Sequence, residues 1–163
     1  MQNSKRLIIL FSVLIVTIVC DQVTKAIAQR YLSPQSTSYL NDLFRLQLAQ
    51  NNGAFLSLGS FLSEQARFWI FTILVGFFLL GLLIYAVRVA AQSSPTFLIA
   101  LGLILGGGVS NLLDRVLHNG LVIDFMNMGI GNLRTGIFNV ADVMLMAGLA
   151  LLLFTRNQAD LSN

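Results

Sequence analysis

The chain has 163 residues, of which 56% are hydrophobic and only 10% are charged, whereas about a quarter of the residues in soluble domains are charged. This composition predicts an integral membrane protein, and the length suits a single domain over residues 1–163. The basic residues behind the net charge of +3 are scattered, so no nucleic-acid partner is expected. The single cysteine, Cys20, lies in an apolar run, which excludes a disulfide framework.

Four apolar stretches approach or reach the roughly 20 residues that a helix needs to cross a bilayer. We predict spans over about residues 7–27, 68–87, 97–114 and 137–154. Lys5 and Arg6 precede the first stretch, as they would in a secretory signal peptide. No small-residue cleavage pattern follows, so the stretch is interpreted as an uncleaved first span. The expected fold class is an all-α membrane protein built on a bundle of four transmembrane helices.

The long loop between the first two spans predicts a small β-sheet or interfacial element at the mouth of the bundle. Residues 43–48 alternate between apolar and polar side chains, which indicates a strand. Asn51, Asn52 and Gly53 then predict a turn. Residues 55–59 are expected to form a second strand or a short helix.

The third span carries small residues on one face. Gly102 and Gly106 have the small-x-x-x-small spacing that lets helices approach closely in lipid, and two further glycines extend this thin face. Close packing is the simplest role for these residues. Its consequence is that Asn111 and Asp114, near the end of the same span, come close to a neighbouring helix.

Polar side chains gather at one membrane face. Four spans place both termini on one side of the membrane, and the ends of the first and third spans lie on the other side. That other side collects Asp21, Asn51, Asn111, Asp114, Asp124, Asn139 and Asp142. Basic residues are densest near the span ends on the terminal side, which favours cytoplasmic termini and an external polar cluster. These basic residues are Lys5, Arg6, Arg88 and Arg156.

Asp124 and Asp142 are the candidate catalytic residues. Asp124 lies in an apolar run with no basic residue within a helical turn, and Asp142 lies at the start of an apolar helix. Two carboxylates in contact cannot both ionise, so one of such a pair holds a proton while the other acts as a base. The alternative for Asp142 is an N-terminal acid that interacts favourably with the helix dipole.

Other charged residues at this face can be explained by structural roles, and the polar cluster as a whole also fits functions other than catalysis. Asp114 and Arg115 fit interfacial charges that satisfy each other or a loop carbonyl. Asp21 and Lys25, at i and i+4, fit an exposed helix pair. His118 is the only histidine, which excludes a His-based metal site. Two other functions stay open: a proton- or cation-coupled transporter, which predicts acids near mid-depth, and a non-catalytic membrane adaptor.

Five segments along the chain resemble the lipoprotein signal peptidases (signal peptidase II), which are aspartic endopeptidases of the bacterial membrane. Their order and spacing match that family across essentially the whole chain. The segments are Asp21-Gln22-Val23-Thr24-Lys25, Asn51-Asn52-Gly53-Ala54, Gly107-Gly108-Val109-Ser110-Asn111-Leu112-Leu113-Asp114-Arg115, Gly120-Leu121-Val122-Ile123-Asp124-Phe125 and Phe138-Asn139-Val140-Ala141-Asp142.

The resemblance implies cleavage of prolipoprotein signal peptides just before a cysteine that carries diacylglycerol. It implies four transmembrane helices with a small sheet on the outer face, and catalysis by Asp124 and Asp142 without a metal or cofactor. The expected partners are lipid-modified prolipoproteins and membrane lipid, and the enzyme is expected to be a monomer in the bacterial cell membrane (the inner membrane of a Gram-negative cell). The expected supporting or substrate-binding residues are Asp21, Asn51, Gly53, Asn111, Asp114, Arg115 and Asn139.

The chain departs from the family pattern at two places. The family often has Gly-Ala-Ala-Phe after the loop asparagine, where this chain has Gly53-Ala54-Phe55-Leu56. It often has glycine before the asparagine of the third span, where this chain has Ser110. Neither departure touches the two aspartates.

Overall fold

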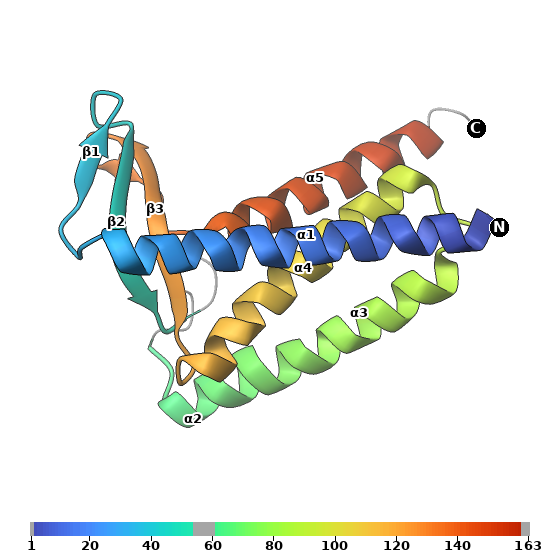
Figure 1. The fold of residues 1–163 in the computed structure, drawn as a ribbon, viewed down its shortest axis with the longest axis horizontal. Coiled ribbons are helices and arrows are strands. Elements are labelled where there is room, and N and C mark those ends of the chain that lie inside the picture. The colour runs from blue at the N-terminus through green and yellow to red at the C-terminus, as the bar shows by residue number, and fades with distance from the viewer. Residues whose placement is uncertain (1, 54–60, 161–163) are drawn as a thin grey trace.

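The computed structural model describes residues 2–53 and 61–160. The described chain contains several helices and four β-strands (Figure 1). The helical elements are α1 (Gln2–Tyr31), α2 (Glu64–Arg67), the π-helical segment η2 (Phe68–Leu74), α3 (Val75–Val89), α4 (Pro95–Leu117) and α5 (Val140–Asp160). The strands are β1 (Thr37–Tyr39), β2 (Phe44–Asn51), β3 (Val122–Ile130) and β4 (Leu133–Arg134).

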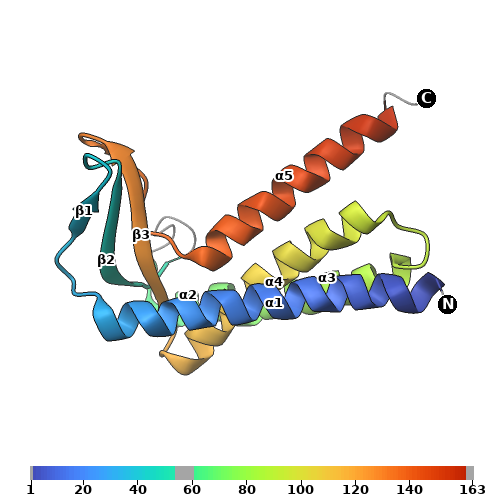
Figure 2. The ribbon, with the colours of Figure 1, turned by 45° about the horizontal axis from the view of Figure 1, so that its top comes forward.

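The sheet lies across one end of the helices, and both chain termini lie at the opposite end (Figures 1 and 2). The turn between α3 and α4 is also at the terminal end. The C-terminal ends of α1 and α4 and the N-terminal end of α5 therefore lie at the end of the bundle that carries the sheet. This arrangement agrees with the predicted gathering of polar residues at one end.

Among the described residues, three helical segments are long and apolar enough to cross a membrane: Ser4–Tyr31, Glu64–Val89 and Pro95–Leu117. They contain the first three predicted spans and extend beyond them at both ends. The fourth predicted stretch is helical, but it contributes only a shorter apolar helix, Val140–Thr155. Helix α5 begins at Val140, slightly after the predicted start of this span at about residue 137, because the backbone N–H of Phe138 donates to Met126 O of β3 at 2.8 Å.

Helix starts follow ordinary capping chemistry. The Ser94 side chain accepts a hydrogen bond from the Phe97 N–H at 3.2 Å, and Pro95 occupies the first turn of α4. Ser63 accepts in the same way from the Ala66 N–H at the start of α2. These caps set where the second and third long helical segments begin.

Helix α4 is the centre of the bundle, and its glycines allow the close approach that the sequence predicts. A Cβ added to Gly102 or Gly106 would lie within 3.0 Å of side chains of α1. A Cβ on Gly107 would lie 2.6 Å from the carbonyl oxygen of Ala141 in α5, and one on Gly108 would lie 2.6 Å from Leu79 in α3. The thin face of α4 thus packs against three helices and not one.

The four strands form one antiparallel sheet in the order β1-β2-β3-β4. The strand predicted over residues 43–48 is confirmed as β2, which continues to Asn51 at the position predicted for a turn. Strand β3 was not predicted, because its first four residues are all buried and lack an alternating pattern. The prediction for residues 55–59 lies outside the described residues.

Candidate active site

Four buried aspartates meet where the bundle joins the sheet. Asp21 comes from α1, Asp114 from α4, Asp124 from β3 and Asp142 from the first turn of α5. None is more than 9% exposed. Isolated buried carboxylates are strongly unfavourable, so each needs a cation, hydrogen-bond donors or a proton. The way each requirement is met divides the four aspartates into two pairs.

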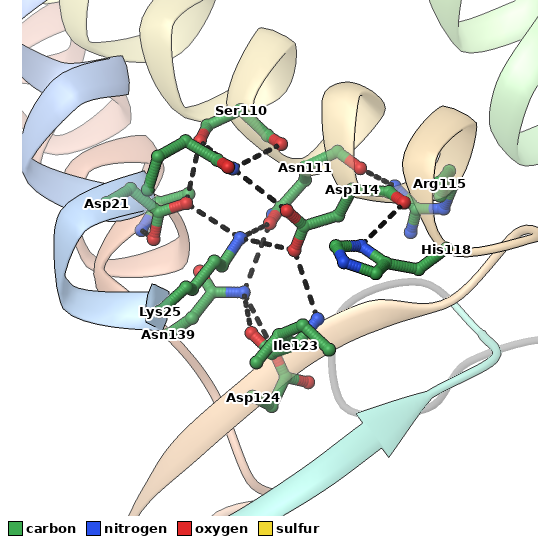
Figure 3. A network of polar contacts seen from close by, with 12 residues as sticks. Asp21, Lys25, Ser110, Asn111, Asp114, Arg115, His118, Ile123, Asp124 and Asn139 are labelled. Carbon is green, nitrogen blue, oxygen red and sulfur yellow. Dashed lines mark hydrogen bonds and ion pairs between the residues drawn. The ribbon is translucent and has the colours of Figure 1, made fainter. Parts of the chain in front are cut away.

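The first pair is neutralised by Lys25. The ammonium Nζ lies 2.6 Å from Asp21 Oδ2 and 2.8 Å from Asp114 Oδ2, and all three side chains are at most 3% exposed (Figure 3). The interpretation of Asp21 and Lys25 as an exposed helix pair is therefore wrong, since α1 presents both residues to α4. Pairing of Asp114 with Arg115 is also wrong, because Lys25 is the cation beside Asp114.

Asp21 of α1 also accepts hydrogen bonds from two other helices, α4 and α5. Its Oδ2 accepts from Ser110 Oγ of α4 at 2.7 Å, and its Oδ1 accepts from the backbone N–H of Ala141 in α5 at 2.8 Å. Ser110 is the position where the family often has glycine. Its hydroxyl gives this chain an additional donor to a buried carboxylate, and such a hydrogen bond typically contributes about 1.5–3 kcal/mol.

Asp114 anchors the sheet to the bundle. Its Oδ2 accepts from the backbone N–H of Ile123 in β3 at 3.0 Å, and its Oδ1 accepts from Gln22 Nε2 of α1 at 2.8 Å. Ile123 directly precedes Asp124, so this contact sets the position of Asp124 relative to α4. Gln22 also donates to Ser110 Oγ at 3.0 Å. Gln22 is a member of the cluster that was not predicted, although it directly follows Asp21.

The second pair, Asp124 and Asp142, is held by amide groups. Asp124 accepts from Asn51 Nδ2 at 2.9 Å and from Asn139 Nδ2 at 2.7 Å. Asp142 Oδ1 accepts from Asn111 Nδ2 at 3.1 Å. Within the described part of the chain, no ion pair within 4.0 Å joins a cation to either carboxylate.

Asn139 links the two aspartates. It is the residue before α5, and its Oδ1 accepts from the Asp142 N–H at 3.0 Å, while its own N–H donates to Asp142 Oδ2 at 3.2 Å. These reciprocal bonds have the geometry of a capping box. The Asn139 NH₂ group at the same time reaches Asp124 (Figure 3). Asp142 therefore is the N-terminal helix acid of the alternative interpretation, and it also shares Asn139 as a hydrogen-bond partner with Asp124.

Arg115 and Gly53 border this pair. The Arg115 Nη2 donates to Gly53 O at 2.9 Å, and Asn51 Oδ1 accepts from the Gly53 N–H at 2.9 Å. The guanidinium group thus binds a loop carbonyl, as one of the two alternatives for Arg115 expected. These contacts hold the backbone after β2 in place while Asn51 faces Asp124.

The pKa of Asp124 is raised from 3.8 to about 7. Burial is the main cause, and the nearby Asp142 carboxylate raises it further, whereas the hydrogen bonds from Asn51 and Asn139 lower it. Asp124 thus carries a proton through the slightly acidic range and can exchange it near neutral pH. This is the behaviour that a general acid or base requires.

This shift predicts a pH-dependent contribution to stability. The folded protein keeps the Asp124 proton up to about pH 7, whereas an ordinary carboxyl group releases it near pH 3.8. The free energy of unfolding therefore falls as the pH rises through this window. Asp124→Asn cannot titrate, so its thermal unfolding temperature, measured in detergent, should rise relative to the wild type between pH 5 and pH 8. If the unfolding temperatures of Asp124→Asn and the wild type changed with pH in parallel, that result would contradict the raised pKa of Asp124.

Comparisons with known proteins show which family and which solved structures this chain is similar to. The model of the signal peptidase (SPase) II family matches residues 13–157. The lipoprotein signal peptidase of Anoxybacillus flavithermus is 34% identical over 84% of this chain and 78% of its own length. That of Halalkalibacterium halodurans is 33% identical over 88% of each chain. A bacterial membrane enzyme solved by the in meso method superposes with a TM-score of 0.76 and 26% identity, over 91% of this chain and 87% of that one.

These likenesses define the protein as a mostly helical membrane enzyme with a small antiparallel sheet. The chain belongs to the signal peptidase II family, and it is therefore a peptidase. This assignment confirms the resemblance seen in the five segments and favours the peptidase over the transporter alternative.

Proposed function

We propose that the protein is an aspartic endopeptidase in which Asp124 and Asp142 form the catalytic pair. It cleaves the signal peptide of diacylglyceryl-modified prolipoproteins just before the lipidated cysteine. One observation carries the proposal: Lys25 neutralises Asp21 and Asp114, whereas Asp124 and Asp142 are held by amides and lie close enough to influence each other. A pair of this second kind shares a proton, as aspartic proteases require.

The proposed reaction activates a water molecule between the two carboxyl groups. The ionised carboxylate takes one proton from the water, whose oxygen attacks the scissile carbonyl carbon. The protonated partner donates its proton to the carbonyl oxygen and becomes ionised. When the tetrahedral intermediate collapses, the carbon–nitrogen bond breaks, and the first carboxyl group gives its proton to the leaving amine. The second carboxylate takes a proton from a hydroxyl group of the intermediate, whose oxygen becomes the carbonyl oxygen of the new carboxyl terminus. The pair then returns to its starting state with one shared proton, and no metal or organic cofactor takes part.

The surrounding polar residues support the pair in this proposal. Asn51, Asn111 and Asn139 hold the two carboxyl groups in position through the bonds described above. Arg115 and Gly53 present backbone and side-chain groups beside the pair, where an extended peptide can bind. Asp21 and Asp114 fix the positions of α1, α4, α5 and β3 relative to one another through their hydrogen bonds. We propose one domain over residues 1–163 that acts as a monomer.

We propose that α5 is a fourth membrane span and that both termini are cytoplasmic, with the active site at the outer face. The chain ends and the α3–α4 turn share the end of the bundle opposite the sheet (Figure 1). Basic residues lie near the span ends on this side, as the positive-inside rule requires. A cysteine placed at Ser93 in this turn, on a Cys20→Ser background, should react with an impermeant thiol reagent only after the cells are opened. Labelling from outside would reverse the orientation.

The proposed substrate predicts that cleavage depends on the lipid. The diacylglyceryl chains stay in the bilayer and set the depth of the scissile bond, which is a positioning effect. A lipidated precursor should therefore be cleaved at least about 100 times faster than its unlipidated form. The measurement compares both forms of one prolipoprotein with purified enzyme in the same vesicles, with Asp124→Asn as the blank. Equal rates would refute the substrate assignment.

A further inference from the structure

The ammonium group of Lys25 lies at the centre of the polar cluster (Figure 3). Besides its two ion pairs, Nζ donates to Asn111 Oδ1 at 2.9 Å. An ammonium group has three protons and no acceptor, so these three contacts use its whole hydrogen-bonding capacity. The third contact does nothing to neutralise charge, because Asn111 is neutral. It therefore needs an explanation other than charge pairing.

This contact determines which way the Asn111 amide faces. Because Lys25 can only donate, the amide oxygen must face it and the NH₂ group must face the other side. On that side Nδ2 donates to Asp142 Oδ1 at 3.1 Å. A flipped amide would set its NH₂ group against the ammonium and its oxygen against the carboxyl group. Both contacts would be repulsive in a buried site.

The same orientation passes from Asn111 to Asn139. The Asn111 oxygen also accepts from Asn139 Nδ2 at 3.1 Å, so the NH₂ group of Asn139 faces α4 and β3. That NH₂ group donates to Asp124 Oδ1 at 2.7 Å, while the Asn139 oxygen accepts from the Asp142 N–H at 3.0 Å. Lys25, which can only donate, thus fixes the orientation of the Asn111 and Asn139 amides. Each amide then presents its NH₂ group to one of the two aspartates.

We propose that Lys25 is a positioning residue for the catalytic pair. Its ammonium group fixes the amide orientation of Asn111, and through it that of Asn139, so that NH₂ groups face Asp142 and Asp124. Asp21 and Asp114 hold the ammonium group in place for this task. The inference rests on the proposed role of Asp124 and Asp142 in the peptidase reaction.

Two substitutions separate the donor from the charge. Lys25→Met removes both, whereas Lys25→Gln removes the charge but keeps an NH₂ group that can donate to Asn111 from one bond nearer the backbone. We expect kcat per folded enzyme to fall about 100-fold in Lys25→Met and about 10-fold in Lys25→Gln, with KM within about threefold in both. Lys5→Met, at an exposed lysine near the other end of α1, is the matched control and should keep wild-type kcat.

The assays report kcat, KM and the folded fraction for each variant. If Lys25→Met does not fold, Lys25→Met/Asp114→Asn replaces it. This double variant removes one positive and one negative charge, so the net charge of the cluster stays the same as with one ammonium and two carboxylates. Its kcat should lie well below that of Asp114→Asn alone. Folded Lys25→Met with wild-type kcat would overturn the proposal, and so would equal losses in Lys25→Met and Lys25→Gln, which would assign the effect to charge. Asp124→Asn in the same assay tests the catalytic pair separately, so activity in that variant would count against the proposed function and not against Lys25.

Discussion

Replacing either Asp124 or Asp142 by asparagine is expected to lower kcat at least about 1,000-fold while the protein stays folded. Asparagine has nearly the same size as aspartate, but it can neither accept the proton of the attacking water nor carry the shared proton. In the described part of the chain, both carboxyl groups accept hydrogen bonds from amide groups and neither forms an ion pair. Removing either negative charge therefore breaks no ion pair, and the fold should persist.

The double variant should be little worse than either single variant, because residues that act as one unit do not contribute additively. Wild-type activity should also fall at both pH extremes, since the pair must hold one proton and not two or none. The Asp124 pKa of about 7 places the loss at high pH just above neutrality. The measurement is kcat against pH on lipidated substrate.

Asp42→Asn is the matched control for the catalytic substitutions. Asp42 lies in the turn before β2, its side chain is 39% exposed, and it pairs with Arg45 and Arg134. Removing this carboxylate should leave kcat unchanged. Substantial activity in folded Asp124→Asn or Asp142→Asn would refute the assignment of both aspartates as the catalytic pair.

Adding one methyl group at Gly107 is expected to damage the active site from a distance. A Cβ at this position would lie 2.6 Å from the backbone oxygen of Ala141, which directly precedes Asp142. Because the obstacle is backbone and not a flexible side chain, α5 must move away from α4, and Asp142 moves with it. A shift of about 1 Å in a catalytic group typically costs about 100-fold in rate. We expect Gly107→Ala to lose at least this much kcat and to unfold at a lower temperature.

Gly81→Ala is the control for this substitution. A Cβ at Gly81 in α3 meets nothing within 4 Å, so alanine fits there without displacement. Alanine is favoured over glycine in a helix by up to about 1 kcal/mol, and Gly81→Ala should therefore match or slightly exceed the wild type in stability. Wild-type kcat in folded Gly107→Ala would show that α4 and α5 can separate without moving the catalytic pair.

Much of the fold can be predicted from the sequence because membrane helices obey a simple rule. A bilayer forces every backbone polar group of a spanning segment to be satisfied within a helix or a barrel, so long apolar stretches predict helices directly. The three long helical segments follow from this rule, and the glycines of α4 predict its close packing. Strand β3 does not follow, since a short apolar run without alternation has no periodicity that separates strand from helix.

The sequence also places the polar residues at one end of the bundle, because the number of spans decides on which side each loop lies. It singles out Asp124 and Asp142 by their apolar neighbours and lack of a local cation. What it does not determine is how the charges are partnered. Sequence spacing pairs Asp21 with Lys25 on an exposed helix face and sets Asp114 beside Arg115. The tertiary structure instead buries Lys25 between Asp21 and Asp114.

That difference has a physical cause. Which cation neutralises a buried carboxylate depends on distances between helices, and these depend on where α4 can approach its neighbours. Only the packed bundle brings Lys25 of α1 within 2.8 Å of Asp114 and the amide of Asn139 within 2.7 Å of Asp124. The sequence by itself thus determined the membrane class, the family and the candidate pair of aspartates. The tertiary structure decided which two aspartates are neutralised by a cation and which two, in the described part of the chain, are held by amide groups without an ion pair.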